Sequence, residues 1–133
     1  MGLKFDLLVA MNDAILEERW DDVGAILHPE LTAWSPTYNL ESSDAWVAAL
    51  QQQNSGLEDI QTRLRFVAET DDVVVYEAEW SIPNPARSGR AVLHSISVFE
   101  FDGDKVRALR QYWDSKSFYD QLTPSSTPAG HDG

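Results

Sequence analysis

Residues 99–114 read FEFDGDKVRALRQYWD, and this stretch decides the fold. Apolar and polar residues alternate on both sides of Asp102-Gly103, which is the pattern of two antiparallel strands joined by a tight turn. A three-residue loop at 102–104 places Phe101 opposite Lys105 and keeps the large aromatic side chains on one face. A two-residue turn would shift every pairing by one position and send side chains to the other face. We therefore expect the longer loop.

The longer loop sorts the side chains of this hairpin into two faces. The first face carries large apolar side chains: Leu93, Phe99, Phe101, Leu109 and Trp113. The second face mixes apolar side chains with four polar ones: His94, Arg110, Tyr112 and Asp114. Polar groups that converge on an apolar surface are the usual composition of a small-molecule pocket. We therefore expect the second face to line a cavity and the first face to be covered by a second copy of the chain.

The sequence before the hairpin changes from helical to strand periodicity near residue 56. Apolar residues recur at helical spacing in three segments, at residues 5–19, 21–27 and 42–54. Alternation with a period of two follows in segments 62–68 and 73–82 and enters the hairpin at residue 90. A short helix at 115–122 closes the pattern. Helices followed by a meander of strands predict an α+β fold, with the helices on one face of an antiparallel sheet.

Composition limits the partners of the protein. The chain has 133 residues, 22 acidic and 10 basic side chains, a net charge of −12 and no cysteine. This charge repels phosphate backbones and anionic lipid, so we expect neither nucleic-acid nor membrane binding. No secretory leader and no membrane-spanning run is visible, which favours a cytoplasmic protein. We predict one domain at 1–122 and a disordered tail at 123–133, rich in Pro, Ser, Thr and Gly.

The order of these elements resembles the nuclear transport factor 2-like superfamily. Within it, the segments FEFDGDKV (99–106), RQYWD (110–114) and FYDQL (118–122) resemble the end of SnoaL-like polyketide cyclases and limonene-epoxide-hydrolase-like proteins. The resemblance covers residues 5–122. It implies a cone-shaped, curved antiparallel sheet, with three N-terminal helices on its concave face and a short C-terminal helix.

The resemblance also implies site residues. Asp114 falls where the cyclases keep an acid/base aspartate and where the epoxide hydrolases keep one of two catalytic aspartates. The Arg-x-Asp that the hydrolases carry on an earlier strand is replaced by Glu77-Ala78-Glu79, which argues against their standard triad. The two acids of ketosteroid isomerases correspond to Ser35 and Ser97, so that chemistry is also disfavoured. Of the three families, the cyclases are the one whose site residues this sequence matches best.

Each candidate residue has a catalytic and a structural interpretation. Asp114 can transfer a proton from the floor of an apolar cone, or it can cap the helix that starts at Ser115. His94 can be its acid/base partner, can orient Asp114 or a ligand carbonyl, or can be a hydrogen-bonded residue of the core or the sheet edge. Arg110 can stabilise an oxyanion or form an ion pair across the sheet. Tyr112 can donate a hydrogen bond from its hydroxyl to a ligand carbonyl, or it can pack its ring against the protein with the hydroxyl in solvent.

Four further residues are candidates for substrate binding. Trp34, Tyr38 and Trp46 are expected to wall the mouth of the cone, where aromatic rings suit a flat ligand, although core filling is the alternative. Glu79 can contribute a second carboxylate, or it can belong with Glu77 to a solvated face. No spacing of His, Asp and Glu indicates a metal site, and no glycine-rich phosphate loop occurs, so no cofactor is indicated.

Three hypotheses for the function follow. The first is a cofactor-free cyclase or isomerase that uses Asp114 and His94 on a small apolar polyketide- or terpenoid-type carbonyl compound, with Arg110 and Tyr112 holding the enolate oxygen. The second is an epoxide hydrolase that activates water with Asp114 and Glu79. The third is a noncatalytic ligand-binding or dimerisation module. In each case we expect a homodimer through the first face of the hairpin.

Overall fold

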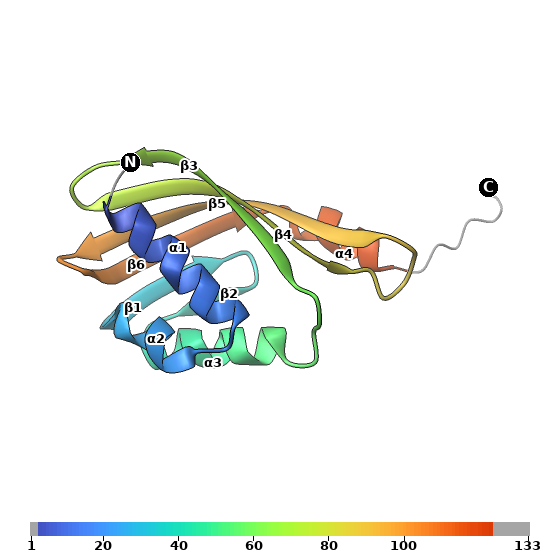
Figure 1. Cartoon of the computed structure of the whole chain (residues 1–133), viewed down its shortest axis with the longest axis horizontal. Helices are drawn as coiled ribbons and strands as arrows, with labels where there is room; N and C mark the ends of the chain where they lie inside the picture. The colour runs from blue at the N-terminus through green and yellow to red at the C-terminus, as the bar shows by residue number, and fades with distance from the viewer. Residues whose placement is uncertain (1–2, 124–133) are drawn as a thin grey trace.

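The computed structural model describes residues 3–123 (Figure 1). The predicted disordered tail lies, from residue 124 on, outside the described residues. No helix in the described range is long and apolar enough to cross a membrane. The elements, in chain order, are α1 (Leu3–Leu16), α2 (Trp20–Ala25), β1 (Leu27–Ser35), β2 (Tyr38–Leu40), α3 (Ser43–Asn54), β3 (Gln61–Glu69), β4 (Val73–Pro83), β5 (Arg90–Asp102), β6 (Lys105–Trp113) and α4 (Ser115–Leu122).

The six strands form one curved sheet in the order β2-β1-β6-β5-β4-β3. Helices α1, α2 and α3 cover one side of it, and α4 lies near the ends of β4 and β5 (Figure 1). This arrangement confirms the predicted α+β class, with three N-terminal helices and one C-terminal helix. One pairing departs from the expected antiparallel sheet, because β1 runs parallel to β6. The amide of Val106 donates to the carbonyl of Ile26 at 2.8 Å, which starts both strands side by side.

The hairpin turn is shorter than predicted. Asp102 pairs with Lys105, and Gly103 adopts a positive φ of 62° in the two-residue turn between them. A β-bulge between Glu100 and Phe101 then shifts the register, so that Phe99 pairs with Leu109. A bulge adds one residue to one strand and turns the side chains that follow to the other face. The bulge thereby restores the two faces that the longer loop predicted, although the loop itself was wrong.

The orientation of the two faces is opposite to the prediction. Phe99 and Leu109 of the first face are fully buried in one cluster with Leu8 of α1 and Trp46 of α3. The helices need the most continuous apolar surface to bury their own apolar side chains, and the first face provides it. The first face therefore lies inside the cone and cannot form the predicted dimer interface. The second face is the outer surface of the sheet.

Replacement of Phe99 tests this orientation. The Phe99 ring stacks on Tyr76 with ring centroids 5.6 Å apart and an interplanar angle of 15°. We expect Phe99→Ala to lower the free energy of unfolding in urea by ~3–5 kcal/mol, the cost of a large cavity in a core. Val67→Ala, at a side chain that is 51% exposed, is the control and should stay within ~0.5 kcal/mol of the wild type. Equal losses in the two variants would contradict the assignment.

Candidate functional site

A cavity of about 130 Å³ lies between the inner face of the sheet and helices α1 and α3. An engineered protein cavity of ~150 Å³ binds benzene, so this space accommodates a ring-sized ligand. Aromatic rings make up much of the wall: Tyr38, Trp46, Tyr76, Trp80, Phe99 and Trp113. The polar part of the wall is mostly neutral: Asn12, Asn54, Thr62, Ser95, Ser97 and Gln111.

A chain of hydrogen bonds joins three elements at the cavity wall. Trp46 Nε1, on α3, donates to the hydroxyl of Tyr38 on β2 at 3.0 Å. The Tyr38 hydroxyl donates in turn to Oε1 of Gln111 on β6 at 2.9 Å. Burial raises the pKa of Tyr38, and hydrogen bonds from Trp46 and with Ser35 offset part of this rise. The phenol therefore stays neutral at physiological pH and holds the amide of Gln111 in place.

Two further features order the walls. Asn12 of α1 donates from Nδ2 to the hydroxyl of Thr62 on β3 at 2.8 Å, which fixes the orientation of its amide at the cavity wall. Tyr76 lies deep in the sheet wall, where burial raises its pKa strongly. Both tyrosines of the cavity are thus hydrogen-bonding groups rather than bases at neutral pH.

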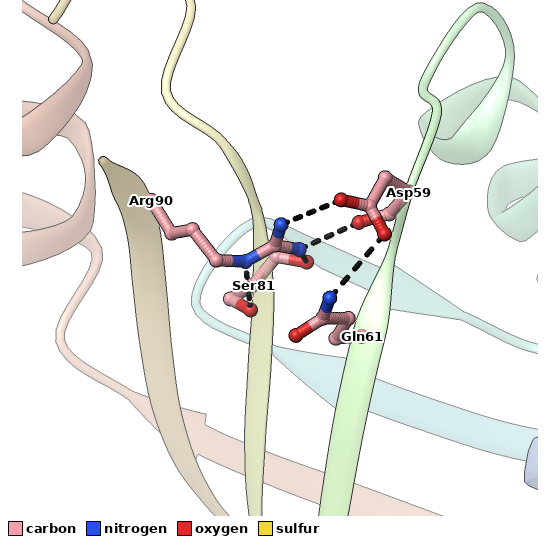
Figure 2. A network of polar contacts seen from close by, with 4 residues as sticks. All are labelled: Asp59, Gln61, Ser81 and Arg90. Atoms are coloured by element: carbon pink, nitrogen blue, oxygen red, sulfur yellow. Dashed lines mark hydrogen bonds and ion pairs between the residues drawn. The ribbon is translucent and has the colours of Figure 1, made fainter. Parts of the chain in front are cut away.

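The segment between α3 and β3 is fastened to the sheet by Arg90 (Figure 2). Its guanidinium donates to the carboxylate of Asp59 at 2.8 Å and to the backbone carbonyl of the same residue. It also donates to the hydroxyl of Ser81 at 3.0 Å. The hydrogen bond from Arg90 lowers the pKa of Asp59, whose backbone has a positive φ of 53°. The network fixes the chain just after Asn54, at the end of the helix that walls the cavity.

Glu79 is the only carboxylate among the described residues of the cavity wall, and that wall contains no Asp, His, Lys or Arg. Its Oε2 atom lies 3.8 Å from Nδ1 of His94, whose side chain is 74% exposed on the outer face. Between residues 3 and 123 no group of three His, Asp or Glu side chains could hold a metal ion. Apart from Glu79, the described residues of the cavity wall are therefore neutral hydrogen-bonding and apolar groups.

The structure does not bring the four predicted catalytic residues into this cavity. Asp114 is exposed, and its Oδ1 accepts the amide of Ser117 at 3.0 Å, which is the helix-capping alternative. Arg110 forms an ion pair with Glu100, which raises the pKa of the guanidinium. His94 and Tyr112 belong to the outer face. The expectation that these four groups converge on a cavity was wrong, because it depended on the orientation of the sheet.

The predicted binding residues are divided between the two faces. Tyr38 and Trp46 line the cavity, and Glu79 borders both the cavity and the groove outside it. Trp34 lies on the outer face, where its ring is 5.2 Å from that of Tyr112. Sequence reasoning missed Gln111. The signal was present, because Gln111 lies two residues from both Leu109 and Trp113 and therefore shares the first face with them.

Comparison with known proteins agrees with this fold. The SnoaL-like domain model matches residues 8–109. A limonene-epoxide-hydrolase-like enzyme of Mycobacterium tuberculosis superposes with a TM-score of 0.72 at 18% identity, over 90% of this chain and 88% of that one. A protein of Shewanella putrefaciens, assigned as a SnoaL-like polyketide cyclase, gives 0.79 at 14% identity, over 92% and 86%. TerC, co-crystallised with polyporic acid, gives 0.76 at 14% identity, over 91% and 98%.

The chain belongs to the SnoaL-like domain family and has a nuclear transport factor 2-like fold. Comparison with curated protein sequences finds no significant match. At identities below 20%, the structural likenesses show the fold, and the fold hosts several chemistries. The function therefore has to be argued from the cavity of this chain.

The Tyr38 hydroxyl offers a test of the hydrogen-bond chain. We expect Tyr38→Phe to lower the free energy of unfolding by ~1–3 kcal/mol, because Trp46 Nε1 loses its acceptor in the core. The pKa of Tyr38 in the folded protein is raised above the ordinary 10.0. The contribution of the Tyr38 hydroxyl to the free energy of unfolding is therefore complete below pH 10 and is lost as the pH rises through the pKa of the folded protein. The wild type and the variant should therefore converge above pH 10 in urea titrations. A constant difference across that range would contradict the assignment.

Proposed function

We propose that the protein binds a small, mainly apolar carbonyl compound of the polyketide or terpenoid kind in the cone cavity. The observation that carries this proposal is the composition of the cavity wall. Aromatic rings surround neutral hydrogen-bonding groups, and such walls are typical of sites for apolar ligands with a few polar atoms. Among the described residues of the wall, the Glu79 carboxylate beside His94 is the only charged group that could replace the hydration of an ionic ligand.

A carbonyl oxygen suits the donors of the sheet wall. The oxygen of the Gln111 amide already accepts the Tyr38 hydroxyl, so its NH₂ group is the part that remains to donate to a ligand. A carbonyl oxygen accepts such hydrogen bonds without bringing a donor of its own. The apolar body of the ligand would then lie against rings such as those of Trp46 and Trp80.

Titration with acetophenone tests the binding site. We expect the indole N–H resonance of Trp46 to shift on titration, because this ring lines the cavity. Ala78→Phe fills the cavity from β4 and should abolish the shift. Ala108→Phe places the same ring on β6 outside the cavity and is the matched control. Binding that survives Ala78→Phe, in a variant with the circular dichroism spectrum of the wild type, would refute the proposal.

Acid–base catalysis, as in a cyclase or isomerase, is the second candidate. The role of Asp114 as the base stays a prediction: the residue follows Trp113 of the cavity wall, but its own carboxylate is exposed and caps α4. The roles predicted for His94, Arg110 and Tyr112 stay predictions that depend on a ligand reaching the outer face. Epoxide hydration by Asp114 and Glu79 is less well supported, because it needs both carboxylates at one bound ligand.

Deuterium exchange tests the acid–base candidate. If Asp114 removes a proton next to a carbonyl, the protein should accelerate incorporation of deuterium into the methyl group of acetophenone in D₂O, followed by NMR. Asp114→Asn should abolish this acceleration without lowering stability, since Asn caps a helix as well as Asp does, whereas Asp114→Ala should cost ~1 kcal/mol. Full exchange activity in Asp114→Asn would eliminate Asp114 as the base.

We further propose a homodimer through the outer face of the sheet. The side chains of Trp34, Ile96 and Tyr112 are 39%, 46% and 47% exposed. They form one patch, because Tyr112 pairs with Ile96 on the neighbouring strand and its ring contacts the ring of Trp34. Exposed apolar groups gathered on one sheet face favour association of two copies, and a twofold dimer is the commonest form. The charge of −12 opposes association but is screened beyond ~8 Å at physiological salt.

Light scattering at micromolar concentration tests the dimer. The wild type should have twice the 15.0 kDa mass of the chain. Ile96→Glu should return the species to the mass of one chain, because it buries a charge in the interface. Tyr119→Glu is the control, since this ring is 50% exposed but belongs to α4. A wild type with the mass of a single chain would exclude the proposed dimer.

A further inference from the structure

Two buried polar atoms in the described part of the chain have no hydrogen-bond partner, and both belong to residues that line the cavity. They are Oδ1 of Asn54 and Oγ of Ser97. Ser97 is 0% exposed. Buried side-chain polar atoms are nearly always hydrogen-bonded, so two exceptions at one cavity need an explanation. A bound ligand that supplies the missing partners provides one.

The two atoms come from different walls. Asn54 is the last residue of α3, on the helical side of the cavity, and Ser97 lies in β5, on the sheet side. The backbone near Asn54 is held in place, because its carbonyl accepts the amide of Leu57 at 3.1 Å. The Arg90 clamp on Asp59 fixes the chain that follows (Figure 2). Both polar atoms therefore stand on ordered elements rather than on a free loop.

The chemistry of each atom specifies its partner. The Asn54 oxygen can only accept, so its partner must carry an O–H or N–H group. The Ser97 hydroxyl lies beside the Tyr76 phenol without a hydrogen bond of good geometry, so it can donate to a carbonyl oxygen. The surroundings are apolar, since Leu50, Leu64 and Phe99 line the same cavity.

We infer that the cavity selects a hydroxylated carbonyl compound of ring size, with its hydroxyl donating to Asn54 Oδ1 and its carbonyl oxygen accepting from Ser97. This inference rests on the proposed function and adds to it a second polar group on the ligand. Neither atom has accessible surface in the cavity as it stands, so the side chains of Asn54 and Ser97 have to turn slightly to meet a ligand. A ligand that fills the cavity without offering these partners leaves both atoms without hydrogen bonds and loses affinity.

A pair of ketones of equal shape tests the inference. 4′-Hydroxyacetophenone and 4′-methylacetophenone differ by one hydroxyl in place of one methyl group. In a purely apolar cavity the methyl compound binds more tightly, because the hydroxyl loses its hydrogen bonds to water. We expect the wild type to prefer the hydroxyl compound. The dissociation constants are measured by NMR titration at mildly acidic pH, where the phenol is neutral.

Variants assign the preference to single atoms. Asn54→Leu should reverse the order of the two ketones, with a change in their affinity ratio of about tenfold, the effect of one hydrogen bond. Ser97→Ala should weaken both ketones by a similar factor and leave the ratio unchanged, because both carry the carbonyl. Gln52→Leu, at an exposed position of α3 outside the cavity wall, is the matched control for Asn54→Leu and should keep the preference of the wild type.

The outcomes separate this inference from the proposed function. Equal binding of the two ketones, a preference for the methyl compound in the wild type, or an unchanged ratio in Asn54→Leu would overturn the inference and leave carbonyl binding intact. Failure of acetophenone and of both substituted ketones to bind would overturn the proposed function, and the inference with it. The wild type gives a second measurement: the side-chain amide resonances of Asn54 should shift more with the hydroxyl compound than with the methyl compound. Equal shifts would also count against the inference.

Discussion

Burial of the inner face of the β5–β6 hairpin is the constraint on which the rest of the structure depends. Phe99 and Leu109 have essentially no exposure, and they share one cluster with Leu8 and Trp46 from the helices. Each large side chain buried there contributes a few kcal/mol, so this contact fixes which side of the sheet the helices cover. The sheet curves over α1 (Figure 1). The cavity is the space that the side chains leave between the sheet and helices α1 and α3. The site is thus a consequence of the packing.

The fold could be predicted from the sequence because its signals are local. Alternation around Asp102-Gly103 identified the hairpin, and helical spacing identified the three helices before it. The bulge after Glu100 could not be predicted, since one extra residue leaves no mark in a pattern of alternating side chains. Its effect was to restore the predicted faces despite a shorter turn. Which face points inward was decided by long-range packing against the helices, which no local pattern records.

The site was predicted only in part, for a chemical reason. Tyr38 and Trp46 attract notice because aromatic rings are typical of ligand pockets, and both line the cavity. Gln111, Asn54 and Ser97 attract none, because neutral amides and hydroxyls are common on any surface. The search for ionisable groups instead selected Asp114 together with three residues of the outer face, His94, Arg110 and Tyr112. A neutral cavity is the case in which perturbed acids and bases give the least guidance.

The charge of the whole chain agrees with a neutral ligand. A net charge of −12 repels anions on approach, and the described residues of the cavity wall include no cation to hold one. A cation would be attracted to the surface, but among residues 3–123 Glu79 is the only carboxylate of the wall, and it lies beside His94. Either ion would lose its hydration on entry without a charged partner to replace it. Selection therefore has to come from the positions of neutral donors and acceptors, and these are what helix α3 and strands β5 and β6 supply.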